Sequence, residues 1–493
     1  MKSMVRDFQF LLPSNGKVPD GFVELGVGAE TLLVDQRFHH FPIYDQAHAV
    51  SGLVIGFPYH QDLGEFLVGG SGEDYKALLQ IGNIDELEAD LLPKLAGSFV
   101  IFTWGSLPKR IYLDHGGSIP MVYDRLKKMA ATSVSMILDD AEYDQRFNKP
   151  LYEKMVNYEG IGGWITGTLT AHHDIERLLP NHYLDLDSGN FHRYWPRPFL
   201  AADFMPLAKA AEQIVTSMSA FSSACFSTFR TSQTLTAGYD SRLLLAVCHD
   251  FIDKTCFFTM MTEGNQRDID VSKTLSERFG LKHNVIPLIK SSEDEKAIWD
   301  RAVGDAIREI NREIFPTLKQ LDEVDFIITG AFGEVGRCRY YRQDYMNVND
   351  LPINSEIILS RLTVPITREV KENIDAWLSG LEGLPNSVIF DLAFHELKFG
   401  SWAMGQNPIQ SSIKYNLYPF ALRPVIDAFI RTDPAEKKTG NLFDACIERS
   451  WPELVSIPVN KYGDYRDYLI RLRKLFNLNR LRRYTRDRIA RYR

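Results

Sequence analysis

The segment from Gln233 to Arg242 (QTLTAGYDSR) contains residue types that can bind a phosphate chain. An apolar strand that ends near Thr236 runs into a turn at Gly238. A helix is predicted to start around Asp240, because the residues after it carry an apolar stripe at helical spacing. Unpaired backbone amides and the positive end of a helix dipole attract anions. The sequence therefore predicts a pyrophosphate-binding loop.

Asp240 directly follows this turn. A carboxylate beside a phosphate is repulsive unless a cation bridges the two groups, and Mg²⁺ prefers carboxylate and phosphate oxygens. We therefore interpret Asp240 as a magnesium ligand. The alternative is that Asp240 only caps the helix, since aspartate is a favoured N-cap and the hydroxyl of Ser241 can do similar work. Spacing alone does not separate these two roles, because short glycine motifs match many unrelated sequences.

The segments after the loop alternate between strand and helix patterns. Strands are predicted over 254–261, 283–288 and 325–329, and a helix with apolar residues at i, i+4 and i+8 is predicted over 267–279. This alternation indicates an α/β fold with a parallel, doubly wound sheet. Ligands of such sheets bind at the carboxyl ends of the strands, which is where the loop would lie.

Two segments carry a resemblance to the asparagine synthetase family. Thr236-Ala-Gly-Tyr-Asp-Ser241 resembles the family's Ser-Gly-Gly-x-Asp-Ser pyrophosphate loop, with Thr for the first Ser and Ala237 for the first Gly. Thr329-Gly-Ala-Phe-Gly-Glu334 is similar to its Ser-Gly-x-Gly-x-Asp-Glu element, and this alignment places Glu334 at the metal-binding acid. Further similarities lie, in the family's order, at 263–288, Pro419-Phe420 and 451–458, so the resemblance spans most of residues 205–465.

The resemblance implies a doubly wound PP-loop synthetase domain with helical additions, which uses ATP and Mg²⁺. In this family a carboxylate attacks the α-phosphate of ATP, pyrophosphate leaves, and an amine opens the acyl-adenylate. Magnesium is expected on Asp240 and Glu334. Arg242 either adds positive charge at the phosphates or is a solvent-facing helix arginine. The residues expected to bind the nucleotide are Leu235, Thr236, Ala237, Gly238, Asp240, Ser241, Arg242 and Gly330.

The resemblance also bears on acid–base chemistry. Lys461, in Ile457-Pro-Val-Asn-Lys-Tyr-Gly463, resembles the late lysine that stabilises acyl transfer in ring-closing members, although a loop lysine is usually just solvated. Ring-closing relatives place a tyrosine, and asparagine synthetases an acid, where Ala331 stands here. Candidates for a replacement base are Glu396, Tyr340 and Tyr341, each of which can equally be a structural or surface residue.

The first part of the chain contains further strand patterns. Residues 97–104, 110–117 and 119–123 include alternating apolar positions typical of strands with one buried face. They resemble the glutamine amidotransferase half that precedes the synthetase in this family, and 175–180 and 191–195 resemble the segment joining the halves. The resemblance implies an Ntn-type α-β-β-α sandwich.

A working glutaminase of this family exposes a cysteine as its first processed residue. This sequence starts Met1-Lys-Ser-Met4, and its first cysteine is Cys225. Formation of a glutaminyl thioester by that route needs a thiolate there. We therefore expect a scaffold without glutaminase activity, and Ser3 after trimming is the less favoured alternative. The nitrogen would come from ammonia or an amine, as in members resembling β-lactam synthetases and lasso-peptide cyclases, which lack the cysteine.

Length and composition predict a globular chain of several parts. The 493 residues exceed the ~250–300 at which single cores stop growing, so we expect domains at 1–200 and 201–460 and a basic tail at 461–493. Long apolar runs, a signal peptide and CxxC spacings are absent, which indicates a cytoplasmic protein in a reducing compartment and argues against structural zinc. His39-His40 and His172-His173 are interpreted as surface or core residues, not ligands.

The tail differs in charge from the rest of the chain. Residues 461–493 hold 12 Lys or Arg against 3 Asp or Glu, a net of +9, whereas the whole chain carries −8, which leaves −17 on residues 1–460. Apolar residues interleave with the basic ones, as in an amphipathic helix that binds an anionic surface. An anionic membrane, at the inner face of which the protein would be peripheral, is one candidate partner. A solvated helix packed against the acidic body, or a frayed terminus, is the alternative.

The sequence thus favours an ATP-dependent, AMP- and pyrophosphate-forming amide ligase. Its acceptor would be a small-molecule, sugar or peptide carboxylate, its donor ammonia or an amine, and a nucleic-acid partner is disfavoured. Two alternatives stay open. One is a catalytically degenerate nucleotide-binding or scaffold protein, which the substitutions at Ala237 and Ala331 favour. The other is a PP-loop tRNA-modifying enzyme, which the amidotransferase-like first half disfavours.

Overall fold

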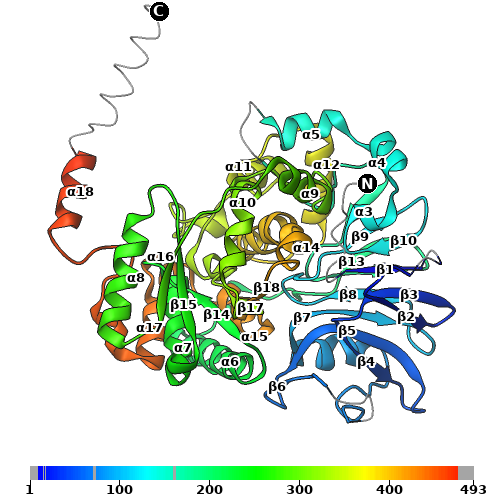
Figure 1. The fold of residues 1–493 in the computed structure, drawn as a ribbon, viewed down its shortest axis with the longest axis horizontal. Helices are drawn as coiled ribbons and strands as arrows, with labels where there is room; N and C mark the ends of the chain where they lie inside the picture. The colour runs from blue at the N-terminus through cyan, green and yellow to red at the C-terminus, as the bar shows by residue number, and fades with distance from the viewer. Residues whose placement is uncertain (1–8, 15, 17, 70–73, 159–162, 476–493) are drawn as a thin grey trace, which may run out of the picture.

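The computed structural model describes residues 9–14, 16, 18–69, 74–158 and 163–475. Met1 to Met4 and most of the basic tail lie outside these residues. The fold is mixed α/β: two antiparallel sheets are built from the first part of the chain, and a parallel five-stranded sheet from the second (Figure 1). None of the helices formed by the described residues combines the length and apolar character that a membrane span needs.

The two antiparallel sheets pack against each other through their apolar faces. Phe10 of one sheet meets Phe102 of the other edge to face, with ring centroids 5.4 Å apart. In order across the first sheet, the strands are β11 Ile175–Arg177, β9 Val122–Asp124, β10 Met129–Ala131, β1 Phe10–Leu12, β3 Glu30–Asp35 and β2 Phe22–Val27. Across the second they are β13 Asn190–Arg193, β12 His182–Asp185, β8 Arg110–Leu113, β7 Leu95–Thr103, β5 Val50–His60 and β4 His39–Tyr44, with β6 Glu65–Phe66 paired to β5.

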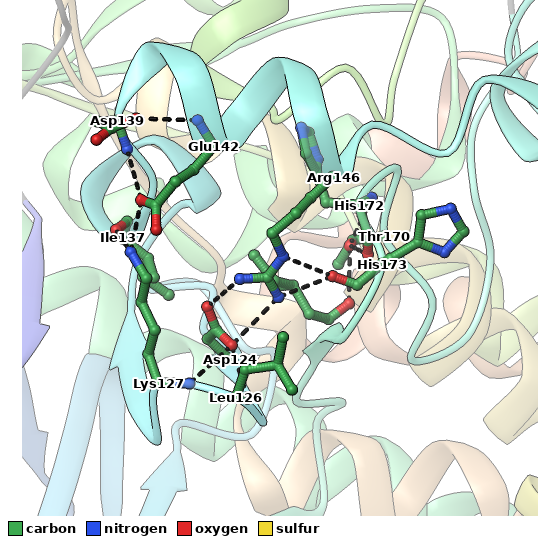
Figure 2. A network of polar contacts seen from close by, with 11 residues as sticks. Asp124, Leu126, Lys127, Ile137, Asp139, Glu142, Arg146, Thr170, His172 and His173 are labelled. Atoms are coloured by element: carbon green, nitrogen blue, oxygen red, sulfur yellow. Dashed lines mark hydrogen bonds and ion pairs between the residues drawn. The ribbon is translucent and has the colours of Figure 1, made fainter.

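Short helices cover the outer faces of these sheets. The second sheet packs on α1 Ile84–Glu86, η1 Leu87–Leu91 and α2 Leu92–Lys94. The first packs on α3 Val134–Ile137 and α4 Asp140–Arg146, and α5 Lys149–Met155 follows. Figure 2 shows how α4 is fixed: Arg146 reaches the buried Asp124 at the end of β9, with an N–O distance of 2.6 Å. His172 is buried beside Tyr143, whereas His173 is exposed.

The parallel sheet has β14 at its centre. Its strands, in order, are β16 His283–Pro287, β15 Cys256–Met261, β14 Thr231–Thr234, β17 Phe326–Ile328 and β18 Tyr415–Leu417. The chain runs outward from β14 to β16 and then returns to β17 on the other side, so the connections change direction between β14 and β17. The prediction of a parallel sheet is confirmed, and its switch point lies at the carboxyl ends of these two strands.

Local signals explain the helices near this switch point. α7 Tyr239–Val247 begins directly after Gly238, one residue before the predicted start. α8 Gln266–Phe279 buries Ile269, Val271 and Leu275 and ends at Gly280, whose φ of +67° is readily adopted by glycine. Both helices belong to the main core together with α6 Leu207–Thr228. The opposite face of the sheet carries η5 Phe315–Gln320 and the residues after it.

Further helices extend this part of the chain. They are α9 Glu293–Ala302, α10 Ile310–Ile314, η6 Gly333–Arg337, η7 Val348–Asp350, α11 Ser355–Leu362, α12 Arg368–Ser379, α13 Asn386–Leu392, η8 Ala393–Ala403, η9 Met404–Gln406, α14 Asn407–Gln410, η10 Pro419–Ala421, α15 Arg423–Ile430, α16 Pro434–Thr439, α17 Asn441–Ser450, η11 Pro452–Ser456 and α18 Tyr465–Leu475. Some short 3-10 helices connect longer elements. They include η3 Ala201–Asp203, η4 His249–Lys254 and η11.

Buried polar contacts join the two parts. The Ser98 hydroxyl on β7 lies 2.7 Å from the Tyr415 hydroxyl on β18. The Asn407 side-chain amide donates to the Ser118 carbonyl at 2.6 Å. Because each contact is buried and links residues far apart in the chain, the antiparallel sheets and the parallel sheet are held in one arrangement.

Candidate functional site

Two loops meet at the switch point of the parallel sheet. The first follows β14 and the second follows β17. A Cβ built on Gly330 would lie 2.8 Å from the Cβ of Asp240, and one built on Gly333 would lie 2.2 Å from its Oδ1. The second loop therefore reaches Asp240 only because both positions are glycine. The structure brings together the two segments on which the predicted site was based.

Side chains of the protein hold the first loop closed. The Ser241 hydroxyl accepts from the Thr236 amide at 3.0 Å and lies 2.8 Å from its hydroxyl. The Gly238 amide donates to the Thr236 hydroxyl at 3.2 Å, and the Ala237 amide donates to Asp268 at 3.0 Å. The Leu235 amide, just after β14, donates to the Phe258 carbonyl on the neighbouring strand. Amides available to an anion are therefore those of the first turn of α7, which lack intrahelical acceptors.

Asp240 is a partly exposed carboxylate with one buried oxygen that has no partner among the described residues. Its Oδ2 accepts from Arg337 Nη2 at 2.6 Å, while Oδ1 has no hydrogen-bond partner among the described residues. Burial raises the pKa of Asp240 to about 7; Arg337 opposes this rise and the Glu334 carboxylate adds to it. Glu334 Oε1 lies 3.9 Å from the same Arg337 nitrogen. The two predicted metal ligands thus lie near the same Arg337 nitrogen, and Glu334 Oε1 also lies 3.7 Å from Arg339 Nη1.

This donor set fits a magnesium ion. Mg²⁺ is usually bound by one or two carboxylates together with phosphates and water, and the unpartnered Oδ1 of Asp240 is the kind of oxygen it takes. In the described part of the chain, no cluster of three or more His, Cys, Asp or Glu gathers as a self-sufficient metal site. An ion here would therefore depend on oxygens from a bound phosphate.

Arg242 is not at the phosphate position and is not exposed to solvent, which corrects both interpretations of this residue. Its side chain is fully buried, and Nη1 donates to the carbonyls of Leu454 and Ile457 at 3.2 and 2.7 Å. It points to the segment that leads to Asn460, whose amide donates to the Ala237 carbonyl at 2.7 Å. Arg242 therefore positions a late segment against the loop. Lys461, the next residue, is exposed beside it.

Glu396 is a structural residue, so its prediction as a catalytic base was wrong. It is fully buried in η8 and accepts from Arg193 Nη1 and Nη2 at 2.7 and 2.6 Å and from Trp377 Nε1 at 2.7 Å. Burial by itself would raise the pKa of Glu396, but Arg193 outweighs it and lowers the pKa to about 2. A carboxylate with these partners is a poor proton acceptor at neutral pH.

The two tyrosine candidates stay protonated. Burial raises the pKa of Tyr340 far above neutrality. Tyr341 is fully buried, its hydroxyl lies 3.1 Å from Asp391, and burial and then Asp391 raise its pKa still further. Asp391 is itself paired with the buried Lys437. Neither tyrosine is suited to removing a proton from an amine.

Sequence reasoning missed a cavity of about 270 Å³ beside the second loop. Ala331 lines it, and its small side chain leaves space there. The lining combines side-chain amides with aromatic rings and includes Asn311, Gln406, Gln410, Asn416, Phe399, Trp402 and Tyr418. Gln406 accepts from Asn311 at 2.9 Å and from Gln410 at 3.2 Å, so the amides form a connected, uncharged network.

Lys398, which contacts the Trp402 ring of this lining, was also missed. Its Nζ lies 4.1 Å from the centre of the Trp402 ring and 4.3 Å from that of Trp164. Burial lowers the pKa of Lys398 to about 8, although the nearby Glu309 carboxylate opposes the shift. The sequence signal for the contact between Lys398 and Trp402 was their four-residue spacing on one helix. Trp164 comes from a distant segment, which the sequence did not indicate.

Comparison with known proteins identifies no family. No family model matches this chain, and no curated protein matches it. Among solved structures, a U34-tRNA thiolase, NcsA from Methanococcus maripaludis with its 4Fe-4S cluster, aligns over 38% of this chain and 77% of its own, at 9% identity and a TM-score of 0.20. A TM-score this low carries no argument about fold or function.

Proposed function

We propose that this protein is an ATP-dependent amide ligase of the asparagine synthetase-like class, which forms AMP and pyrophosphate. In this proposal the antiparallel sheets form an Ntn-type sandwich that serves as a scaffold, and the parallel sheet belongs to a PP-loop synthetase domain. One observation carries the proposal. The glycines of the second loop press against Asp240 at the amino end of α7, where its Oδ1 has no partner among the described residues.

The residues of the two loops have different roles in phosphate binding. The amides and dipole of the first turn of α7 bind the pyrophosphate that leaves when the substrate carboxylate attacks the α-phosphate. Asp240 and Glu334 would hold Mg²⁺, which supplies positive charge between these acids and the phosphates. Arg337, 2.6 Å from Asp240, keeps this carboxylate paired when no nucleotide is bound.

The cavity beside Ala331 is the proposed site of the carboxylate and amine substrates. Its connected amides suit a neutral polar group such as a sugar or peptide amide, and they offer no fixed charge. Lys398 replaces the missing base. An amine with a pKa near 8 is partly neutral at physiological pH and can accept the proton that the substrate amine loses as its nitrogen attacks the acyl-adenylate and AMP leaves. Lys461 remains the candidate for stabilising the acyl-transfer step.

The test is an assay of pyrophosphate release by the full chain with Mg·ATP, candidate carboxylates and amines. Asp240→Asn should abolish release, while Asp253→Asn, at an exposed aspartate, should match the parent. Lys398→Met should retain release of pyrophosphate but slow amide formation roughly 10²–10⁴-fold, the usual contribution of a general base. Release by Asp240→Asn at the parental rate would exclude the assigned role of the loop.

One observation favours a second candidate, a nucleotide-binding protein without catalysis. Arg337 Nη2 lies 2.6 Å from Asp240 and 3.9 Å from Glu334, so a protein cation already lies near both acids that would hold the ion. If this ion pair is permanent, the protein would bind ATP weakly and without magnesium. Calorimetry with ATP in the presence and absence of Mg²⁺ separates the two candidates, because only the ligase requires the ion for tight binding.

The basic tail is proposed to bind an anionic membrane surface. The described part of it, α18, is anchored to the body by Arg466, whose Nη1 lies 2.7 Å from Asp270 on α8. The residues beyond α18 include seven arginines and one aspartate. Basic residues near an anionic surface each contribute about 1 kcal/mol. Equal sedimentation of the full chain and a chain ending at Leu475 with phosphatidylserine vesicles would contradict this proposal.

A further inference from the structure

A second, larger cavity lies at the junction of the two parts of the molecule, and the proposed ligase reaction does not use it. Its volume is about 430 Å³. It is bounded by η1 and α2 on the antiparallel sheet, by the connecting segment 194–203, and by α15. None of the residues of the two phosphate loops lines it.

Arg423, the first residue of α15, supplies a buried cation to this cavity. Its side chain is only 6% exposed, its Nη2 lies 2.9 Å from His115 Nδ1, and its Cζ lies 3.9 Å from the centre of the Trp195 ring. Burial and then Arg423 hold the pKa of His115 well below its usual value, so the ring is neutral and accepts this hydrogen bond.

Among the described residues, no carboxylate lies within ion-pair distance of the Arg423 guanidinium, and Nε and Nη1 have no acceptor at hydrogen-bond geometry. The Tyr194 ring centre lies 5.8 Å from Cζ, and burial lowers the pKa of Arg423 while Tyr194 and Asp427 oppose this shift. Leaving a buried charge uncompensated is costly, so an arginine in this state is ready to bind an anion. Nε and an Nη together form the fork that binds both oxygens of a carboxylate.

The other charged groups limit how negative this anion can be. Glu88 is neutralised by Arg110 at 3.0 Å, but Asp427 and Asp203 also line the cavity, as does the cation Arg197. Arg431 lies 3.9 Å from Asp427 and donates to the Asp203 carbonyl at 3.0 Å. With two acids near the cations, a single negative charge is better accommodated than the double charge of a phosphate monoester.

We infer that this cavity binds a small aromatic monocarboxylate. The carboxylate pairs with the Arg423 guanidinium, and the aromatic ring lies among Tyr194, Trp195 and Phe199. Because the ligand contacts the connecting segment and α15 together, its binding stabilises the junction between the two parts. This site is independent of the proposed ligase activity.

The probe for this site is benzoate, measured on the full chain by calorimetry and by thermal unfolding. We expect benzoate to bind and to raise the melting temperature. Benzyl alcohol, which lacks the charge, and phenyl phosphate, which carries more of it, should each bind at least roughly tenfold more weakly, as expected for loss of a charge-assisted hydrogen bond. Absence of benzoate binding at about 10 mM, or tighter binding of phenyl phosphate, overturns the inference.

Variants of Arg423 and Trp195 test where benzoate binds. Arg423→Met should abolish benzoate binding, and Arg423→Lys, which keeps the charge but loses the fork, should weaken it roughly tenfold. Arg368→Met, at an arginine whose side chain is 91% exposed, is the matched control and should bind as the parent does. If Arg423→Met does not fold, Arg423→Lys and Trp195→Leu provide the same test. Unchanged benzoate affinity in Arg423→Lys and Trp195→Leu would place the ligand elsewhere and overturn the inference.

Discussion

Asp240 has an unpaired carboxylate oxygen that is unfavourable for the stability of the fold but is suited to binding a ligand. Its side chain is partly exposed, one oxygen is paired with Arg337, and the other is buried without a partner among the described residues. The raised pKa of about 7 means that the folded protein holds this proton more tightly than the unfolded chain. The stability contributed by the proton is fully present below about pH 4 and is lost as the pH rises through 7.

The proposed magnesium role gives the opposite dependence for binding. Since Mg²⁺ takes the ionised carboxylate, we expect the affinity for Mg·ATP to increase as the pH rises from 6 to about 8, with release of a proton near pH 7. Calorimetry in two buffers of different ionisation enthalpy measures both quantities. Asp240→Asn should show neither effect. A parental affinity that does not change over this range would contradict the assignment.

At the scale of elements, the site is set by how closely two loops approach. The switch between β14 and β17 brings the loops together, and glycine at positions 330 and 333 lets them touch. Ser241 closes the first loop on Thr236, and Asn460 adds a third segment through the Ala237 carbonyl. The geometry of Asp240 therefore depends on three segments of the chain.

Gly333→Ala tests this contact. The added methyl group would lie 2.2 Å from Asp240 Oδ1, so the carboxylate or the loop must move. We expect Mg·ATP affinity to fall at least tenfold and the free energy of unfolding to fall by about 1–3 kcal/mol, as for other overpacked sites. Gly26→Ala, where a Cβ would meet nothing within 4 Å, is the control. Unchanged nucleotide affinity in Gly333→Ala would show that the loops do not form the binding site.

At the scale of the whole molecule, buried polar pairs fix the two parts against each other. Arg193 is the last residue of β13 and Glu396 lies in the helical region, and their side chains meet at 2.6 Å with Glu396 fully buried. The lowered pKa of Glu396, about 2, means that its contribution to stability is present above about pH 4.5 and is lost as the pH falls toward 2.

Glu396→Gln should therefore leave Arg193 as a buried, unpaired charge. Breaking such a pair costs about 3–5 kcal/mol, which denaturant unfolding at pH 7 would measure. The loss relative to the parent should shrink as the pH approaches 2. Glu382→Gln, at an exposed glutamate, should leave stability unchanged. A Glu396→Gln protein as stable as the parent would mean that this pair does not hold the two parts together.

The sequence by itself determined the elements whose signals are local. Apolar spacing and Gly280 located α8 almost to the residue, and strand and helix patterns in alternation predicted the parallel sheet. The turn between β14 and α7, within Thr236 to Ser241, was also predicted from the sequence, because a glycine followed by an apolar stripe at helical spacing is a signal carried by adjacent residues. These features depend on neighbours in the chain, which the sequence displays directly.

Only the tertiary structure decided what the charged side chains do. Arg242 caps carbonyls more than 200 residues away, Glu396 pairs with Arg193 across a similar separation, and Arg423 is left with nitrogens that no described residue satisfies. The free energy of a buried charge depends on which distant groups reach it, and no local pattern encodes that. Periodicity places a residue on an element, whereas packing of the whole chain selects its partner.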